Sequence, residues 1–132
     1  MKILVVEDDF VSRLLMQRVL SSRGEVHVAV DGQEAVMAYE SAVAEGAPYQ
    51  LICLDIMMPK MDGHEVLRRI RDSERARGIA AGLGARILMT TAVESGRTVL
   101  ETFRDQCDGY LIKPIDRETP YRHLDEFGLK AA

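Results

Sequence analysis

Short apolar runs alternate with segments of helical periodicity along the whole chain. The runs occupy residues 3–6, 25–30, 51–54, 85–90 and 109–112, and several of them are rich in β-branched side chains. Runs this short and this apolar are typical of strands that are buried on both faces, as in a parallel sheet.

The segments between the runs have the spacing of amphipathic helices. In the first of them Val11, Leu14, Leu15 and Val19 share one face, and we expect Arg13 on the opposite, solvated face. Further helices are predicted from Gly32 to about residue 43, from Asp62 onward, over about residues 95–103 and over about residues 116–127.

Two local signals support these helix boundaries. Asp31 with Glu34 three residues later reads as a capping box at the start of the second helix, and Gly46 follows its end. Pro120 fits the last helix only near its first turn. The stretch 73–84, rich in Arg, Ala and Gly, predicts an extension of the third helix followed by a mobile loop.

The order is therefore strand and helix repeated five times, which predicts an α/β fold with helices on both faces of one parallel sheet. The 132 residues fit a single domain, 1–132. No apolar run approaches the roughly 20 residues that span a bilayer. The amino-terminal run is too short and too acidic for a signal peptide, so we expect a cytoplasmic protein.

Charge and cysteine usage agree with that expectation. The net charge of −4 argues against direct binding to nucleic acid, because phosphate binding favours a basic face. Cys53 and Cys107 lie in or beside apolar segments, where we expect reduced and inert thiols.

Acidic residues and a lysine lie at the carboxyl ends of the predicted strands. Glu7, Asp8 and Asp9 follow the first strand, Asp55 follows the third, and Lys113 follows the fifth. Ligands of parallel α/β sheets bind at this edge. Carboxylates that gather there repel one another unless a cation compensates them, and Mg2+ prefers such oxygen ligands.

Each of these residues alone has a simpler interpretation. A lone strand-end aspartate is more often a helix cap, Asp9 is in part a cap for the first helix, and Lys113 alone would be a solvated lysine. The combination at one edge, with Thr91 as a hydroxyl donor after the fourth strand, instead favours phosphoryl transfer to a carboxylate.

Four stretches carry a resemblance to a known family: residues 3–9 (ILVVEDD), 54–63 (LDIMMPKMDG), 88–92 (LMTTA) and 109–114 (GYLIKP). In this order and spacing they resemble the signature blocks of the response-regulator receiver domains of two-component signalling, and the match covers about the whole chain. The resemblance implies a doubly wound, flavodoxin-like (βα)5 fold with the strand order 2-1-3-4-5.

The resemblance also implies roles for the residues at the sheet edge. Asp55 is expected to accept the phosphoryl group as an acyl phosphate. Asp8 is expected to ligate Mg2+ directly and Glu7 to act through water, with Asp55 and the backbone carbonyl of Met57 completing the protein ligands. Asp9 is an additional acid outside that pair.

The remaining roles concern the response to phosphorylation. Thr91 is expected to move toward the phosphoryl group and Lys113 to contact it, while Tyr110 turns from an outward to an inward position. The Lys113-Pro114 peptide bond is expected to be cis. The surface that then changes shape would be formed by residues 95–103, 109–112 and 116–127.

The same resemblance implies the partners. The phosphodonor would be a histidine kinase or a histidine phosphotransfer protein, and a downstream protein would bind the changed surface. We expect neither nucleic acid nor membrane as a partner, and either a monomer or a phosphorylation-dependent dimer. The domain would be a stand-alone receiver or part of a larger protein, and would catalyse only its own phosphorylation and slow dephosphorylation.

The phosphate is expected to be long-lived. Met57 and Val93, two residues past Asp55 and Thr91, are apolar and cannot orient an attacking water.

Three alternative classes of protein share part of this pattern. A small phosphatase that phosphorylates an aspartate would have a second acid soon after Asp55, where the chain has Ile56, Met57 and Met58. A flavodoxin-like cofactor carrier would have a phosphate-binding loop after the first strand, where this chain has three acids. A receiver-shaped docking module that is never phosphorylated remains an alternative.

Overall fold

A parallel sheet of five strands forms the centre of the molecule, in the order β2-β1-β3-β4-β5. The computed structural model describes residues 1–92 and 106–129. The strands are β1 (Lys2–Val6), β2 (Glu25–Ala29), β3 (Leu51–Asp55), β4 (Arg86–Ala92) and β5 (Gly109–Lys113). The predicted doubly wound α/β fold and its strand order are therefore confirmed.

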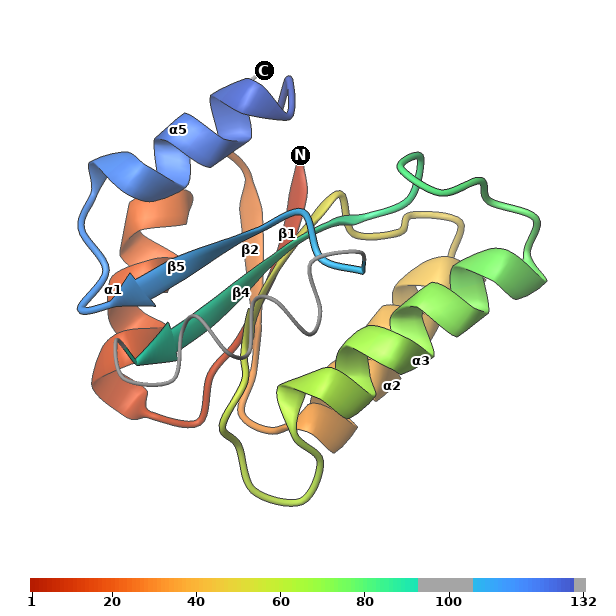
Figure 1. The fold of residues 1–132 in the computed structure, drawn as a ribbon, viewed down its shortest axis with the longest axis horizontal. Coiled ribbons are helices and arrows are strands. Elements are labelled where there is room, and N and C mark those ends of the chain that lie inside the picture. Colours follow the sequence, from red (N-terminus) through yellow and green to blue (C-terminus); the bar gives the residue numbers. More distant parts are fainter. Residues whose placement is uncertain (93–105, 130–132) are drawn as a thin grey trace.

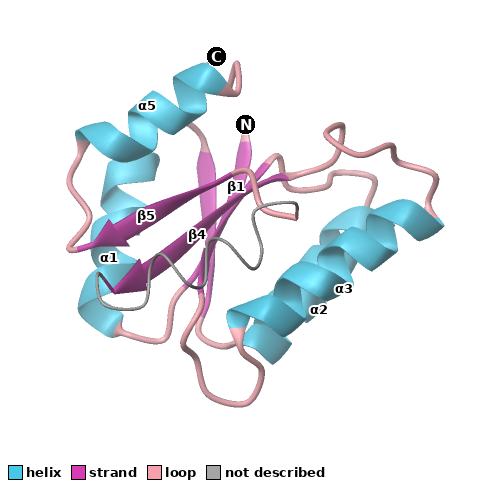
Figure 2. Cartoon of the chain, viewed as in Figure 1, coloured by secondary structure: helices cyan, strands magenta, loops and turns pink. Residues whose placement is uncertain are grey.

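Helices cover both faces of the sheet (Figure 1). Helices α1 (Phe10–Leu20) and α5 (Glu118–Glu126) lie on one face, and α2 (Gly32–Ala44) and α3 (Gly63–Ala76) lie on the other (Figure 2). The extension of α3 to Ala76 agrees with the prediction. The helix predicted at 95–103 lies outside the described residues.

Each face has its own apolar core. Leu54, Val66 and Ile70 belong to the core under α2 and α3, and Met16 and Leu124 to the core under α1 and α5. All five positions of β3 are buried, because this strand has neighbours on both sides and helices above and below.

Both cysteines have free thiols. Burial raises the pKa of the Cys53 thiol to about 12, so this residue behaves as a small apolar side chain. Among the described residues, no helix is both long enough and apolar enough to cross a membrane.

Three strands extend further at their carboxyl ends than the sequence pattern predicted. β3 includes Asp55, which pairs with Thr90, and β4 continues to Ala92, which pairs with Lys113 at the end of β5. The candidate site residues on these strands are therefore held by the ladder itself rather than by the loops that follow it.

The buried face of α1 differs from the prediction. Val11 and Leu15, expected in the core, have exposed fractions of 71% and 41%, while Met16, Val19 and Leu20 are buried. The helix carries apolar residues at helical spacing on more than one face, and the sheet contacts only one of them. Phe10, Val11 and Leu15 form an exposed apolar strip, here called the α1 strip.

Helices α2 and α3 both begin with an Asp-Gly pair. The carboxylates of Asp31 and Asp62 each accept the backbone N–H three residues later, at 2.8 and 3.0 Å. The caps fix both helix starts, as the sequence predicted at Asp31. The loops after β2 and β3 lie close together, and the ammonium of Lys60 is 3.4 Å from Asp31.

Candidate functional site

The carboxyl ends of β1 and β3 bring three carboxylates together. One oxygen from each of Glu7, Asp8 and Asp55 lies within 4.8 Å of the other two. Glu7 and Asp55 are buried, with exposed fractions of 3% and 4%, whereas Asp8 is exposed. Two of the three charges are thus shielded from water, which makes their mutual repulsion strong.

Lys113 at the end of β5 supplies the compensating cation. Its Nζ forms an ion pair with Glu7 and lies 3.3 Å from Oδ2 of Asp55. Burial lowers the pKa of Lys113, but its hydrogen bond to Glu7 and the charges of Asp55 and Glu7 outweigh that effect and raise the pKa above its ordinary value. The lysine is therefore charged.

One lysine does not balance the cluster. The pKa of Glu7 is raised, first by burial and then by the neighbouring Asp55, and Lys113 offsets this only in part. Three carboxylates against one ammonium leave an excess of negative charge on hard oxygen atoms. The donor set therefore fits a divalent cation such as Mg2+.

The backbone around Asp55 is held from two sides. The N–H of Met57 donates to Oδ1 of Asp55 at 3.2 Å, and the N–H of Ile56 donates to the carbonyl of Thr90 at 3.2 Å. Gly63 donates to the carbonyl of Ile56 at 2.9 Å. A Cβ at Gly63 would lie 2.4 Å from the backbone oxygen of Asp55, so only glycine fits beside this strand end.

Two neighbouring residues complete the amino-terminal part of the site. The carboxylate of Asp9 accepts the N–H of Ser12 at 2.9 Å and caps α1, and this hydrogen bonding lowers its pKa. Arg13, expected on the solvated face, instead donates through Nη1 to the carbonyl oxygens of Glu7 at 3.0 Å and Asp8 at 3.4 Å. Its position after the acids was the only signal in the sequence for this role.

The residues predicted to respond to phosphorylation lie on β4 and β5. Thr91 is buried, and its hydroxyl donates a hydrogen bond to the carbonyl of Ala92 at 3.3 Å. Tyr110 is exposed, and the Lys113-Pro114 bond is cis, as expected. Val93 lies outside the described residues.

Comparisons with known proteins agree with this fold. The family model of the response regulator receiver domain matches residues 3–124. The chain is 33% identical over 128 residues to the osmosensing histidine protein kinase SLN1 of Saccharomyces cerevisiae, a match that covers 96% of this chain and 10% of that protein. The chain thus spans about a tenth of that relative's length.

Two of the solved structures that are similar in fold illustrate the likeness. One is the receiver domain of Ssk1 in complex with the histidine phosphotransfer protein Ypd1 of S. cerevisiae (TM-score 0.80, 26% identity, covering 97% of this chain and 88% of that one). The other is a complex of CheX and CheY with BeF3 and Mg2+ from Borrelia burgdorferi (TM-score 0.78, 25% identity, covering 98% and 90%).

The chain belongs to the response-regulator receiver domain family. It is a signalling domain of two-component systems, and neither the phosphatase nor the unphosphorylated docking module is favoured.

Proposed function

We propose that this receiver domain is a phosphorylation switch in which Asp55 accepts the phosphoryl group. The observation that carries the proposal is the contact of a buried carboxylate at a strand end with the ammonium of Lys113, next to two further acids. An oxygen of Asp55 attacks the phosphorus of a phosphohistidine. The P–N bond breaks, an acyl phosphate forms, and the histidine nitrogen takes up a proton.

Glu7, Asp8, Asp55 and the backbone carbonyl of Met57 would hold Mg2+, with Glu7 acting through water. When bound, the metal neutralises charge on the phosphoryl oxygens. Lys113 would pair with one of these oxygens after its partner Asp55 has been phosphorylated. The buried hydroxyl of Thr91 would donate to another.

The phosphodonor would dock beside the acids. The α1 strip is an exposed apolar surface on the helix that follows Glu7, Asp8 and Asp9 directly. Exposed apolar side chains next to a reactive group suit a protein partner rather than a small solute. A histidine phosphotransfer protein or a histidine kinase is the proposed partner, as for the similar receiver domain in complex with Ypd1.

The output surface would include β5 and α5. A hollow of about 410 Å³ lies between them, lined by Tyr110, Ile112, Ile115, Thr119 and His123 among others. Phosphorylation would draw Thr91 toward Asp55 and turn Tyr110 inward, which changes the wall of this hollow. A downstream protein, or a second copy of the chain, would bind the changed surface.

Intact mass after incubation with acetyl phosphate and Mg2+ tests the chemistry. We expect the protein to gain the mass of one phosphoryl group, and Asp55→Asn to gain none. Asp9→Asn is the matched control, since it alters an adjacent acid and should still be phosphorylated. A gain that persists in Asp55→Asn, or no gain in the wild-type protein, would refute the proposal.

A further inference from the structure

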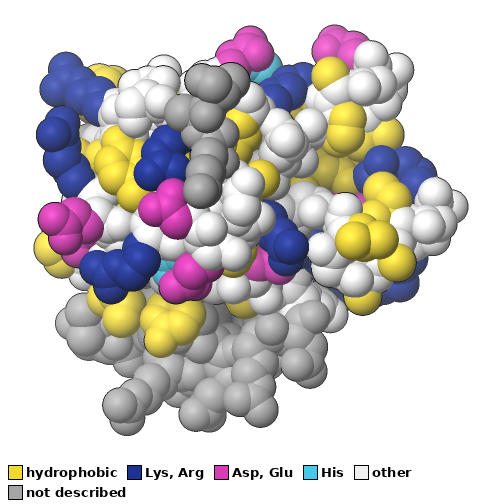
Figure 3. Space-filling view, turned by 90° about the horizontal axis from the view of Figure 1, so that it is seen from above, with side chains coloured by type: hydrophobic (Ala, Val, Ile, Leu, Met, Phe, Trp, Pro, Cys, Tyr) yellow, Lys and Arg dark blue, Asp and Glu magenta, His cyan; other side chains and the backbone are white. Residues whose placement is uncertain are grey.

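A second hollow, of about 390 Å³, lies at the amino-terminal edge of the sheet, opposite the acids. Its volume is within the range of roughly 300–1,000 Å³ that is typical of small-molecule sites. Seen from above, this face of the molecule has a depression with apolar side chains in it and basic side chains nearby (Figure 3). The lining includes Tyr39, Tyr49, Leu83, Phe127 and Leu129.

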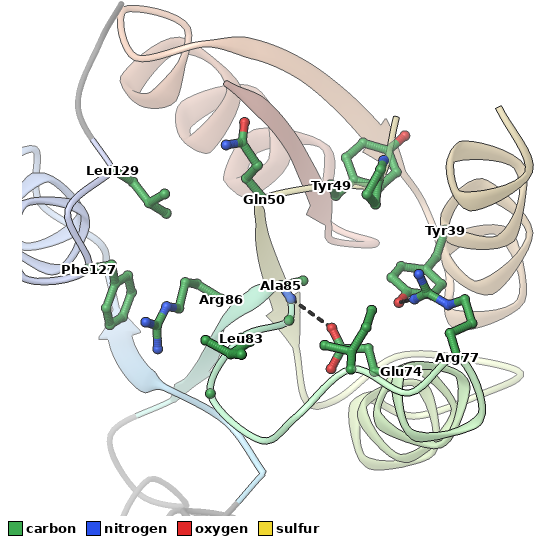
Figure 4. Close-up of a pocket in the computed structure, with 14 residues that line it drawn as sticks. Tyr39, Tyr49, Gln50, Glu74, Arg77, Leu83, Ala85, Arg86, Phe127 and Leu129 are labelled. Carbon is green, nitrogen blue, oxygen red and sulfur yellow. Dashed lines mark hydrogen bonds between the residues drawn. The ribbon is translucent and has the colours of Figure 1, made fainter. Parts of the chain in front are cut away.

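Two guanidinium groups lie on opposite sides of this hollow, each against an aromatic ring (Figure 4). The Cζ of Arg77 lies 5.6 Å from the ring centroid of Tyr39, and that of Arg86 lies 5.4 Å from the ring centroid of Phe127. Planar guanidinium–aromatic pairs of this kind offer a flat surface together with positive charge.

The hydrogen bonds of Arg77 leave its charge for a ligand. Arg77 donates to the hydroxyls of Tyr39 and Ser73, which are neutral, and the ion pairs found among the described residues do not include it. Nη1 of Arg86 lies 3.1 Å from the carboxylate of Asp108, which also pairs with Arg71.

Glu74 is the acid in this lining, and its charge is already engaged. It is buried, accepts the N–H of Ala85 at 2.7 Å and pairs with Arg71 at 2.7 Å. Glu74 therefore anchors the loop that forms one wall. Because Arg71 also pairs with Asp108 at 3.0 Å, Arg71 and Arg86 together balance Glu74 and Asp108, and Arg77 carries the excess positive charge of the lining. The hollow combines aromatic walls with a net positive character.

We propose that this hollow binds a small anion with a planar aromatic body, of the nucleoside monophosphate class. The base would stack on Phe127 or on the guanidinium faces, because the rings of Tyr39 and Tyr49 are buried. The phosphate would pair with Arg77, whose fork geometry matches phosphate oxygens, with Arg86 as a second donor. Because this site and the acid cluster lie at opposite edges of the sheet, binding requires no phosphorylation of Asp55.

Titration of the 15N-labelled protein with AMP and GMP, followed by amide chemical shifts, tests the proposal. We expect saturable shifts at Leu83, Ala85, Arg86 and Leu129 with at least one nucleotide, at a Kd below about 1 mM. Adenosine and inorganic phosphate, titrated separately, should each bind at least tenfold more weakly than the nucleotide that contains both parts.

Charge-removing variants locate the site. Arg77→Gln and Arg86→Gln should each weaken nucleotide binding about tenfold, and Arg86→Lys, which keeps the charge but loses the planar fork, should weaken it as well. Arg75→Gln is the matched control, because this exposed arginine near the end of α3 pairs with Asp72 and lies outside the lining. Thermal unfolding of each variant verifies that it is folded.

Three results would overturn the proposal: no saturable shift with either nucleotide, equal affinity for inorganic phosphate and the nucleotide, or unchanged affinity in both Arg77→Gln and Arg86→Gln.

Discussion

Nζ of Lys113 lies 3.3 Å from Oδ2 of Asp55, so the last strand of the sheet contributes the cation that faces the carboxylate of the central strand. The same ammonium pairs with Glu7 at the end of β1. One side chain therefore connects three strands of the sheet through charge as well as through backbone hydrogen bonds.

Replacing this cation should destabilise the protein. In Lys113→Met the carboxylates of Glu7 and Asp55 stay buried without their partner, and we expect the free energy of unfolding to fall by about 2 kcal/mol in metal-free buffer. Urea denaturation measures it. Lys60→Met, which removes an exposed lysine that pairs with Asp31, is the control and should change it by less than about 0.5 kcal/mol. An equal decrease in the free energy of unfolding in the two variants would show that Lys113 does not compensate the buried carboxylates.

The raised pKa of Glu7 predicts a pH dependence. The folded state binds more protons than the unfolded state between pH 4.5, the ordinary pKa, and the folded-state pKa of Glu7. In metal-free buffer the free energy of unfolding should therefore decrease as the pH rises through this window. Glu7→Gln should remove that decrease. Parallel stability curves for the variant and the wild-type protein would show that Glu7 does not cause it.

The pKa of Asp31 is lowered, so its effect on stability has the opposite sign. The free energy of unfolding should decrease as the pH falls from about 3.8 through the folded-state pKa of Asp31.

The close approach at Gly63 predicts a specific intolerance. A side chain in Gly63→Asn would collide with the backbone of Asp55 and Ile56, so we expect a loss of about 2 kcal/mol in urea denaturation and slower phosphorylation by acetyl phosphate. Gly46→Asn is the control. Gly46 has a φ of 75° with no atom within 4 Å of the added Cβ, and asparagine adopts this conformation readily. If Gly46→Asn is the more damaging change, the steric explanation is wrong.

The lifetime of the phosphate should depend on the side chain at position 57. Met57 is 74% exposed, so Met57→Glu fits without repacking and places a carboxylate where it can orient water. After removal of acetyl phosphate, we expect phospho-Asp55 in this variant to decay several-fold faster by intact mass. Met37→Glu, at an exposed position on α2, should decay like the wild-type protein. The same decay in all three proteins would refute this role for position 57.

The anchor of the α3–β4 loop should matter for folding. Glu74→Ala leaves the buried N–H of Ala85 without its acceptor and removes one of the two carboxylates that pair with Arg71, so we expect a loss of about 3 kcal/mol. Urea denaturation again reports it. Asp72→Ala removes only an exposed pair with Arg75 and should cost less than about 1 kcal/mol. A similar cost for both variants would mean that the buried network adds little.

Features that depend on short-range chemistry could be predicted from the sequence. The apolar runs gave the strands within two residues, and the carboxylates of Asp31 and Asp62 stand at the helix starts as their positions suggested. The convergence of acids and Lys113 followed from the rule for parallel sheets, because their strands all end at one edge.

Features that depend on packing between distant segments could not be predicted from the sequence. The α1 helix has apolar residues on two faces, and only the position of the sheet decides that Met16 is buried and Val11 is exposed. The close approach of Gly63 to Asp55 depends on the path of a loop. The second hollow joins Tyr39, Arg77 and Phe127, which no spacing in the sequence connects.

Asp55 lies on the central strand of the sheet and Lys113 on an edge strand, and this difference has a consequence for dynamics. Asp55 ends β3, the innermost strand, whose amides should be among the last to exchange with solvent, whereas Lys113 ends β5, at the margin of the sheet. If Asp55 is phosphorylated as proposed, we expect its carboxylate to stay in place and the rearrangement to occur on β4 and β5, which carry Thr91, Tyr110 and Lys113.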